Sequence, residues 1–255
     1  KGEFVWLLGN DDLVLPKSFK FLKKIFNKNP DVDFFNINSF NIEKKYINQD
    51  NLPFDTRKIN FSKFNKFSNF NEKGKKEFFE LINPLVSFEF LFSMNLCIYR
   101  RNYWVKNLKK INTKNINDKR LYSNFDNTAP HLKIWSYAFS DKKSFFLDTP
   151  LSANIHGPRE REWGSYYPLI EGIRIPEALE YYKKNGMSFM RFFICKNFAL
   201  RRFIPALYKM LFNPYYRGLN YINIWKHVIK NLLYPSIYFF GIYYVFKRIF
   251  KMIKS

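Results

Sequence analysis

The sequence predicts an α/β fold, in which a partial mixed sheet with flanking helices is followed by a basic α-helical C-terminal extension. Short apolar runs bounded by turn residues, which are typical of buried strands, alternate with segments of helical spacing over residues 1–160. Residues 161–255 instead interleave aromatic and aliphatic residues with Lys and Arg. The length of 255 residues allows one large domain with an appendage, so we place the boundary near residue 160.

The first two elements follow one another closely. A strand is expected at residues 3–8, because the apolar run FVWLL ends in the turn sequence GNDD. A helix is expected at residues 16–29, where apolar side chains recur at helical spacing and lysines occupy the opposite face. Pro16 suits the first turn of this helix, since its φ angle is already helical.

The remaining elements of the first segment are less regular. Residues 41–71 show no sustained period and predict an irregular insertion, and the polar and basic residues 106–120 predict a loop. The expected strands are 33–38, 90–99, 144–147 and 150–155, and the expected helices are 74–82 and 131–139.

The C-terminal extension begins where the composition changes at Arg159 and Arg and Glu start to alternate. A helix is expected at 175–184, with Pro176 near its start. Three basic and aromatic segments follow it, at residues 187–212, 221–233 and 235–253.

The net charge of +22 is concentrated in this extension. Residues 181–255 hold 14 Lys or Arg and no Asp or Glu, which is typical of a protein with an anionic surface partner. The longest uncharged apolar run, residues 231–246, is shorter than the ~20 residues that span a bilayer. We therefore expect helices that lie in the interface of an anionic membrane. The residues expected to face the membrane are Lys226, Lys230, Lys247, Arg248, Lys251 and Lys254.

The composition of the extension also allows other roles. Its helices could pack on the rest of the protein, or form a short re-entrant or spanning hairpin. Binding of single-stranded nucleic acid is disfavoured, since the apolar content exceeds what a solvated strand-binding groove needs.

Several chemistries lack their sequence motifs. The two cysteines have no CxxC spacing, so neither a disulfide framework nor a zinc site is predicted. The sequence contains no Gly-rich phosphate loop, no GxSxG and no HExxH. Residues 1–16 do not have the pattern of a signal peptide.

One acidic pair stands out at the end of the first expected strand. Asp11 and Asp12 are adjacent carboxylates, which are hard-oxygen ligands suited to a divalent cation that also binds phosphates. The alternative is an Asx-type turn that merely ends the strand.

The stretch GEFVWLLGNDDLVLP resembles the DxD region of family-2 glycosyltransferases, which have the GT-A fold. It is most similar to bacterial enzymes that add sugars to O-antigen or capsule, such as abequosyltransferase-like proteins. The resemblance covers residues 1–160 and implies that they form the acceptor-side part of a GT-A sheet. In the family a nucleotide-recognition half precedes this motif, so the resemblance predicts that the given sequence begins after that half.

The resemblance implies that Asp11 and Asp12 hold Mg²⁺ or Mn²⁺ against the diphosphate of a nucleotide sugar. Gly9 and Asn10 stand where many members of the family carry an acid, so one expected carboxylate is missing. Asn10 is expected to lie beside the donor.

Further donor-binding residues are expected near the end of the first segment. His156 follows the strand at 150–155, where the family often has Arg-x-His, and Asn154 replaces the Arg. Arg159 and Arg161 could clamp the diphosphate through their bidentate guanidinium groups. The alternatives are a surface histidine and a solvated run of self-paired charges.

An inverting transferase needs a base that accepts the proton of the attacking hydroxyl. The family supplies an acid before its last strands, and the titratable residues there are His131 and Asp126. The structural alternative for His131 is a residue at the start of a helix, and the alternative for Asp126 is a helix cap.

The resemblance predicts an inverting hexosyl- or deoxyhexosyltransferase. It would move a sugar from a nucleotide-diphosphate sugar to a lipid-linked glycan, as a peripheral protein at the cytoplasmic face of the bacterial inner membrane. One alternative is an inactive remnant or a partner subunit of such an enzyme. Another is a basic protein that binds a membrane surface or nucleic acid, with a coincidental Asp-Asp turn.

Overall fold

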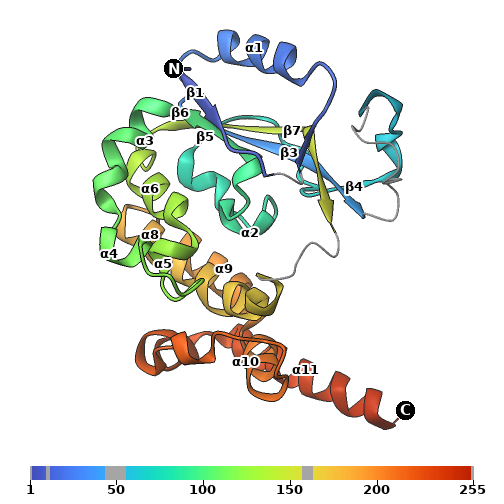
Figure 1. Ribbon diagram of the computed structural model, residues 1–255, viewed down its shortest axis with the longest axis vertical. Coiled ribbons are helices and arrows are strands. Elements are labelled where there is room, and N and C mark those ends of the chain that lie inside the picture. The colour runs from blue at the N-terminus through green and yellow to red at the C-terminus, as the bar shows by residue number, and fades with distance from the viewer. Residues whose placement is uncertain (1, 10–11, 44–55, 157–162, 254–255) are drawn as a thin grey trace. The chain divides into compact units, whose positions relative to one another are not determined.

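The computed structural model describes residues 2–9, 12–43, 56–156 and 163–253 (Figure 1). Contacts divide the chain into two compact units. We call residues 1–108 and 137–159 the sheet unit, and residues 109–136 and 160–255 the helical unit. The predicted mixed α/β architecture with flanking helices is confirmed. Residues 109–136, which the sequence groups with the sheet, belong to the helical unit.

A mixed sheet is the framework of the sheet unit. Its central order is β1-β6-β3-β7-β2, with β4 on β3 and β5 on β7. The β3–β7 pair is parallel and the other pairs are antiparallel. The strands are β1 (Phe4–Trp6), β2 (Asp12–Val14), β3 (Phe34–Glu43), β4 (Asn65–Lys66), β5 (Gly74–Glu77), β6 (Cys97–Arg100) and β7 (Lys143–His156).

Apolar side chains cover both faces of this sheet. Neighbouring residues of a strand point to opposite faces, so Phe34 and Phe35 lie in different clusters. Phe35 packs with Leu22 of helix α1 (Ser18–Lys28). Phe34 makes an edge contact with Phe139, with ring centroids 5.1 Å apart. The sheet is therefore held by cores on both sides.

The helix predicted at 74–82 is wrong. Its first residues form β5, which pairs with β7, and a short 3-10 turn (Phe78–Leu81) follows. Lys75 of β5 also forms an ion pair of 2.7 Å with Asp31. Tertiary pairing thus overrides the local helix preference.

Two strand predictions also need correction. Of the strand expected at 90–99, only Cys97–Arg100 is extended, after helix α2 (Phe88–Leu91) and a 3-10 turn (Met94–Leu96). The two strands expected at 144–147 and 150–155 join in β7, because register shifts opposite Ile37 to Ser39 accommodate Pro150.

Residues 106–120, expected to be irregular, contain regular turns. They include the end of α3 (Arg101–Asn107), a 3-10 turn (Leu108–Lys110) and α4 (Thr113–Ile116). The side chain of Asn112 accepts hydrogen bonds from the backbone N–H groups of Lys114 and Asn115, which starts α4.

The helical unit is built from short helices and turns. Helix α8 (Ile175–Lys184) has the predicted bounds, and the helix expected over 235–253 is α11 (Pro235–Ile253). The other helices are α5 (Phe125–Thr128), α6 (Pro130–Ala138, which continues into the sheet unit), α7 (Tyr167–Leu169), α9 (Phe189–Leu200) and α10 (Phe203–Phe212). π-Helical turns cover Ile170–Arg174 and Ile224–Val228.

Helices α7, α10 and α11 share one apolar core. Leu169, Phe203 and Ile237 are buried in it. Gly172 permits the close approach of α10, since a Cβ atom at this position would lie 2.5 Å from the Cβ atom of Ala206. Within the described ranges, none of the helices combines the length and the hydropathy needed to cross a bilayer.

Candidate functional site

The carboxylate of Asp12 accepts hydrogen bonds from three separate segments of the sheet unit. Its Oδ2 atom accepts the backbone N–H of Gly9 at 2.7 Å. Its Oδ1 atom accepts the side-chain amides of Asn95 at 2.9 Å and Asn154 at 3.0 Å. The orientation of this carboxylate is therefore fixed before any ligand binds.

Strand pairing explains why these groups meet. Asp12 is the first residue of β2 and lies directly opposite Asn154 of β7. Leu151 of β7 anchors the chain after β2, since its carbonyl accepts the hydroxyl of Ser18 at 2.8 Å. The loop that carries Asn95 is held by the indole of Trp6, which donates to the Asn95 carbonyl at 2.8 Å.

This arrangement brings three oxygen-bearing side chains together. The amide nitrogens of Asn95 and Asn154 point at Asp12, and their Oδ1 atoms make no hydrogen bond to any described residue. Carboxylate and amide oxygens are the ligands that Mg²⁺ and Mn²⁺ prefer. Asp12 and the two asparagines therefore supply the ligand types of a hard divalent cation, with the amide N–H groups rather than the amide oxygens facing the carboxylate. Among the residues that the structure describes, no cluster of three His, Cys, Asp or Glu forms a metal site.

Four of the predicted site residues lie outside the described residues. They are the predicted metal ligand Asp11 and the predicted donor-binding residues Asn10, Arg159 and Arg161. His156 is the last residue of β7, two positions after Asn154, and its backbone pairs with Glu43 of β3. The structure thus brings Asp12 to the segment of β7 that ends in His156.

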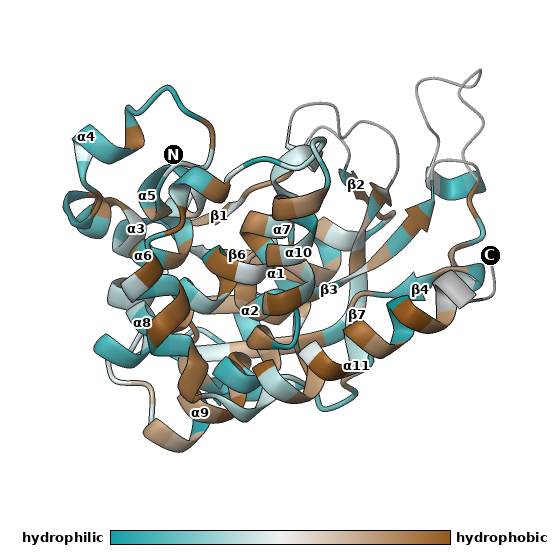
Figure 2. Cartoon of the chain, turned by 90° about the horizontal axis from the view of Figure 1, so that it is seen from below, coloured by the Kyte–Doolittle hydropathy of each residue, from teal (hydrophilic) through white to brown (hydrophobic). Residues whose placement is uncertain are grey.

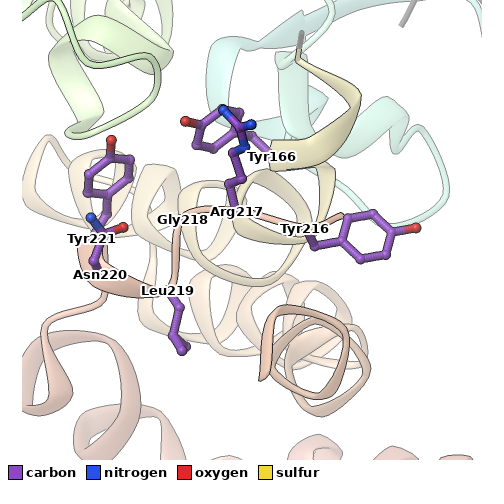
Figure 3. A pocket seen from close by; sticks show the side chains of 7 residues that line it. All are labelled: Tyr166, Tyr216, Arg217, Gly218, Leu219, Asn220 and Tyr221. Carbon is purple, nitrogen blue, oxygen red and sulfur yellow. The ribbon is translucent and has the colours of Figure 1, made fainter. Parts of the chain in front are cut away.

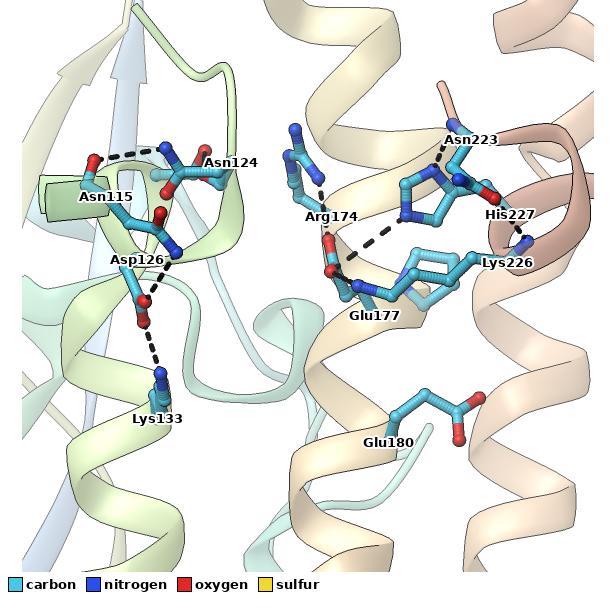
Figure 4. Close-up of polar contacts among 12 residues, drawn as sticks. Asn115, Asn124, Asp126, Lys133, Arg174, Glu177, Glu180, Asn223, Lys226 and His227 are labelled. Carbon is cyan, nitrogen blue, oxygen red and sulfur yellow. Dashed lines mark hydrogen bonds and ion pairs between the residues drawn. The ribbon is translucent and has the colours of Figure 1, made fainter. Parts of the chain in front are cut away.

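Asp126, one of the two predicted bases, is buried in α5 and engaged in hydrogen bonds (Figure 4). Its carboxylate accepts Lys133 Nζ at 2.7 Å, the Asn115 amide at 3.2 Å and the backbone N–H of Asn112 at 3.4 Å. These contacts join α4, α5 and α6, so the group stabilises the helical unit.

His131, the other predicted base, is buried in α6. Its ring lies edge-on against Trp135, with centroids 4.9 Å apart. Both predicted bases therefore lie inside the helical unit, whereas Asp12 belongs to the sheet unit.

The predicted membrane-facing residues have different environments. Lys226 forms an ion pair with the buried Glu177. Lys230, Lys247 and Arg248 are exposed, and the Arg248 guanidinium lies 4.6 Å from the ring centroid of Tyr208. The side chains of Lys251 and Lys254 lie outside the described residues.

One side of α11 is apolar and exposed, and Figure 2 shows apolar residues along this helix. Eight large apolar side chains on it are between 46% and 70% exposed. Their spacing places them on one broad face of the helix. They are Tyr238, Phe239, Ile242, Tyr243, Val245, Phe246, Ile249 and Phe250.

A buried charged network in the helical unit has no counterpart among the sequence predictions (Figure 4). Glu177 accepts a hydrogen bond of 2.7 Å from Arg174, and both side chains are almost fully buried. Lys226 also pairs with Glu177, and His227 Nε2 lies 3.9 Å from its carboxylate. Burial raises the pKa of Glu177, but the neighbouring His227, Arg174 and Lys226 outweigh this effect and bring the pKa to about 2.

Part of the site was missed at the sequence level. Asn154 is recognisable only as a substitution in an expected Arg-x-His pattern, and Asn95 lies in a short turn without any motif.

The chain matches no protein-family model, no curated protein and no solved structure.

Proposed function

We propose that this protein is a divalent-cation-dependent, inverting glycosyltransferase. It moves a hexosyl or deoxyhexosyl group from a nucleotide-diphosphate sugar to a lipid-linked glycan, in the synthesis of a bacterial surface polysaccharide. The observation that carries this proposal is the fixed carboxylate of Asp12, which is flanked by the amides of Asn95 and Asn154. The sequence around Asp12, which resembles a DxD region, supports the same function.

The cation, when bound, stabilises the negative charge that develops on the departing diphosphate. Asp12 would hold and orient it, and the amide oxygens of Asn95 and Asn154 would add further hard ligands. Because Asn95 and Asn154 each donate a hydrogen bond to Asp12, the carboxylate needs little ordering when the cation binds.

The base that accepts the proton of the acceptor hydroxyl is not assigned by this geometry. A base must come within about 2.6–3.2 Å of that hydroxyl. The burial of His131 and Asp126 argues for structural roles, although both stay the candidates that the sequence predicts.

Binding of Mn²⁺ tests the proposal directly. Electron paramagnetic resonance of the free ion measures its affinity for the chain, with and without UDP, GDP or dTDP. Asp12→Asn should weaken Mn²⁺ binding by roughly tenfold or more. Asp141→Asn, which changes a carboxylate that is 74% exposed in the same unit, should not. Equal Mn²⁺ affinity of the wild type and Asp12→Asn would favour the coincidental-turn alternative.

We also propose that the helical unit attaches the protein to the cytoplasmic face of the bacterial inner membrane. The exposed apolar face of α11 and the acid-free sequence of residues 181–255 support this location. Such a helix lies in the membrane plane with its apolar face toward the acyl chains. Lys230, Lys247 and Arg248 would then meet anionic headgroups.

A further inference from the structure

An open cavity of about 510 Å³ lies in the helical unit (Figure 3). This volume is within the range of small-molecule sites. Its wall combines three tyrosines with an arginine and an asparagine. The lining residues are Tyr166, Tyr216, Arg217, Gly218, Leu219, Asn220 and Tyr221. We call this hollow the tyrosine pocket.

The loop that forms one side of the tyrosine pocket is held in a defined shape. The backbone N–H of Arg217 donates to the Ser165 carbonyl at 2.8 Å. Gly218 has a φ angle of +102°, which side chains with a Cβ atom rarely adopt. A Cβ atom here would also lie 2.8 Å from Leu169 Cδ2, so any other residue would have to displace this leucine side chain.

The partly exposed ring of Tyr221 provides a flat apolar surface in the pocket, whereas Tyr166 is only 9% exposed and belongs to the core beside it. The rings of Tyr166 and Tyr221 are nearly parallel, with an interplanar angle of 5° and centroids 6.4 Å apart. Tyr122 holds Tyr166 in place through an edge contact at 5.4 Å. Tyrosine combines an apolar face with a polar hydroxyl, which suits a ligand that is apolar on one side and hydroxylated at its rim.

Two polar side chains of the pocket can bind a ligand without giving up a protein contact. Within the described part of the chain, the guanidinium of Arg217 and the side-chain amide of Asn220 form no hydrogen bond or ion pair. Arg120 lies 5.9 Å from the ring of Tyr221, but its guanidinium is already paired with Asp118 at 2.7 Å, so Arg217 is the cation that the pocket offers to a ligand. None of the described residues that line the pocket is acidic, and the sequence of residues 181–255 contains no Asp or Glu.

We propose that the tyrosine pocket binds a six-membered sugar ring that carries one anionic substituent, either a carboxylate or a phosphate. The ring would stack on a tyrosine face, and the planar fork of Arg217 would bind the anion through two hydrogen bonds. Asn220 can both donate to and accept from sugar hydroxyls. This binding is independent of Asp12, so it holds whether or not the protein transfers sugars.

Saturation-transfer NMR and calorimetry on the full chain test this assignment without any cation. The probes are glucuronate, glucose 6-phosphate, glucose and inorganic phosphate. One of the two anionic sugars should bind at least roughly tenfold more tightly than glucose and than phosphate alone. If glucuronate binds more tightly than glucose 6-phosphate, the substituent is a carboxylate, and the reverse order indicates a phosphate.

Variants locate the binding. Arg217→Gln and Tyr221→Leu should each weaken binding of the anionic sugar by roughly tenfold. The first variant loses a charged hydrogen bond, and the second loses a stacking surface. Arg191→Gln removes an equivalent guanidinium from α9, outside the pocket, and should have no effect. Asp12→Asn should also bind normally, which separates this proposal from the proposed function.

Three results would overturn the assignment. They are equal binding of glucose and the anionic sugars, full binding by phosphate alone, and undiminished binding by Arg217→Gln. Because Arg217 is exposed and its side chain forms no hydrogen bond or ion pair with the described residues, this variant is expected to fold normally. Thermal unfolding of each variant checks that expectation.

Discussion

Asn154 donates a hydrogen bond of 3.0 Å to Asp12 across the β2–β7 pair, although 142 residues separate them in the sequence. If these two residues act together on a cation, Asn154→Ala should lower Mn²⁺ affinity by roughly tenfold. Thr149→Ala, an exposed position on the same strand, serves as the control. An unchanged Mn²⁺ affinity in Asn154→Ala would limit the pair to a structural role.

Glu177→Gln should destabilise the protein. The substitution leaves Arg174 buried without its compensating charge, and breaking a buried pair typically costs about 3–5 kcal/mol. Urea unfolding measures the loss. Glu72→Gln, at a side chain that is 74% exposed, should change the free energy of unfolding by less than ~0.5 kcal/mol. A similar stability for both variants would mean that the buried network contributes little.

The same carboxylate predicts a pH dependence. The pKa of Glu177 is about 2 in the folded protein, whereas an unperturbed glutamate has a pKa of 4.5, so folding favours the ionised form. This contribution is complete above the unfolded pKa and is lost as the pH falls toward about 2. From the shift we expect a loss of about 3 kcal/mol over that window.

The test of this pH dependence is a comparison of variants. The difference in unfolding free energy between the wild type and Glu177→Gln should shrink between about pH 5 and about pH 3. A constant difference over this range would contradict the assigned pKa shift.

The apolar face of α11 should control binding to anionic vesicles. Phe239→Glu and Phe246→Glu each place a charge where an aromatic ring would be buried, at a cost of about 1.5–3 kcal/mol or more. Co-sedimentation with phosphatidylglycerol vesicles should fall by roughly tenfold in each variant. Phe19→Glu matches the chemistry on α1, where the ring is 68% exposed, and should not reduce binding.

The salt dependence of the same assay completes this test. Vesicle binding should weaken as ionic strength rises, because the basic side chains are screened. A single-stranded oligonucleotide that binds more tightly than the vesicles would instead favour a nucleic-acid partner.

Local sequence patterns predicted much of the helical unit. The bounds of α8 and α11 follow from apolar spacing, Pro176 and Pro235, because these signals lie within the helices themselves. The sequence did not reveal β5, whose extended form depends on its pairing with β7. A strand of four residues with two lysines carries too little local signal to outweigh such non-local contacts.

The candidate site was predictable in part for a similar reason. Asp12 is visible in the sequence as an acid that follows an apolar run, but its position at the start of β2 depends on pairing with β7, and its partner Asn95 depends on a turn that Trp6 holds in place. Asp126 is recognisable in the sequence as a titratable residue. Its hydrogen bonds to Lys133 and Asn115 depend on how the helices pack, which sequence spacing alone does not predict.

The segments of the two units alternate along the sequence, which has a practical consequence for expressing the units separately. The segment 109–136 belongs with 160–255 but is interrupted by 137–159 of the sheet unit. A truncation after residue 160 would remove Tyr181, which stacks on Phe125 at 4.6 Å, and Arg174, which donates to the Tyr122 carbonyl at 2.9 Å. Neither unit is therefore one contiguous fragment of the gene, and expressing them separately requires an excised or relinked chain rather than a single stop codon.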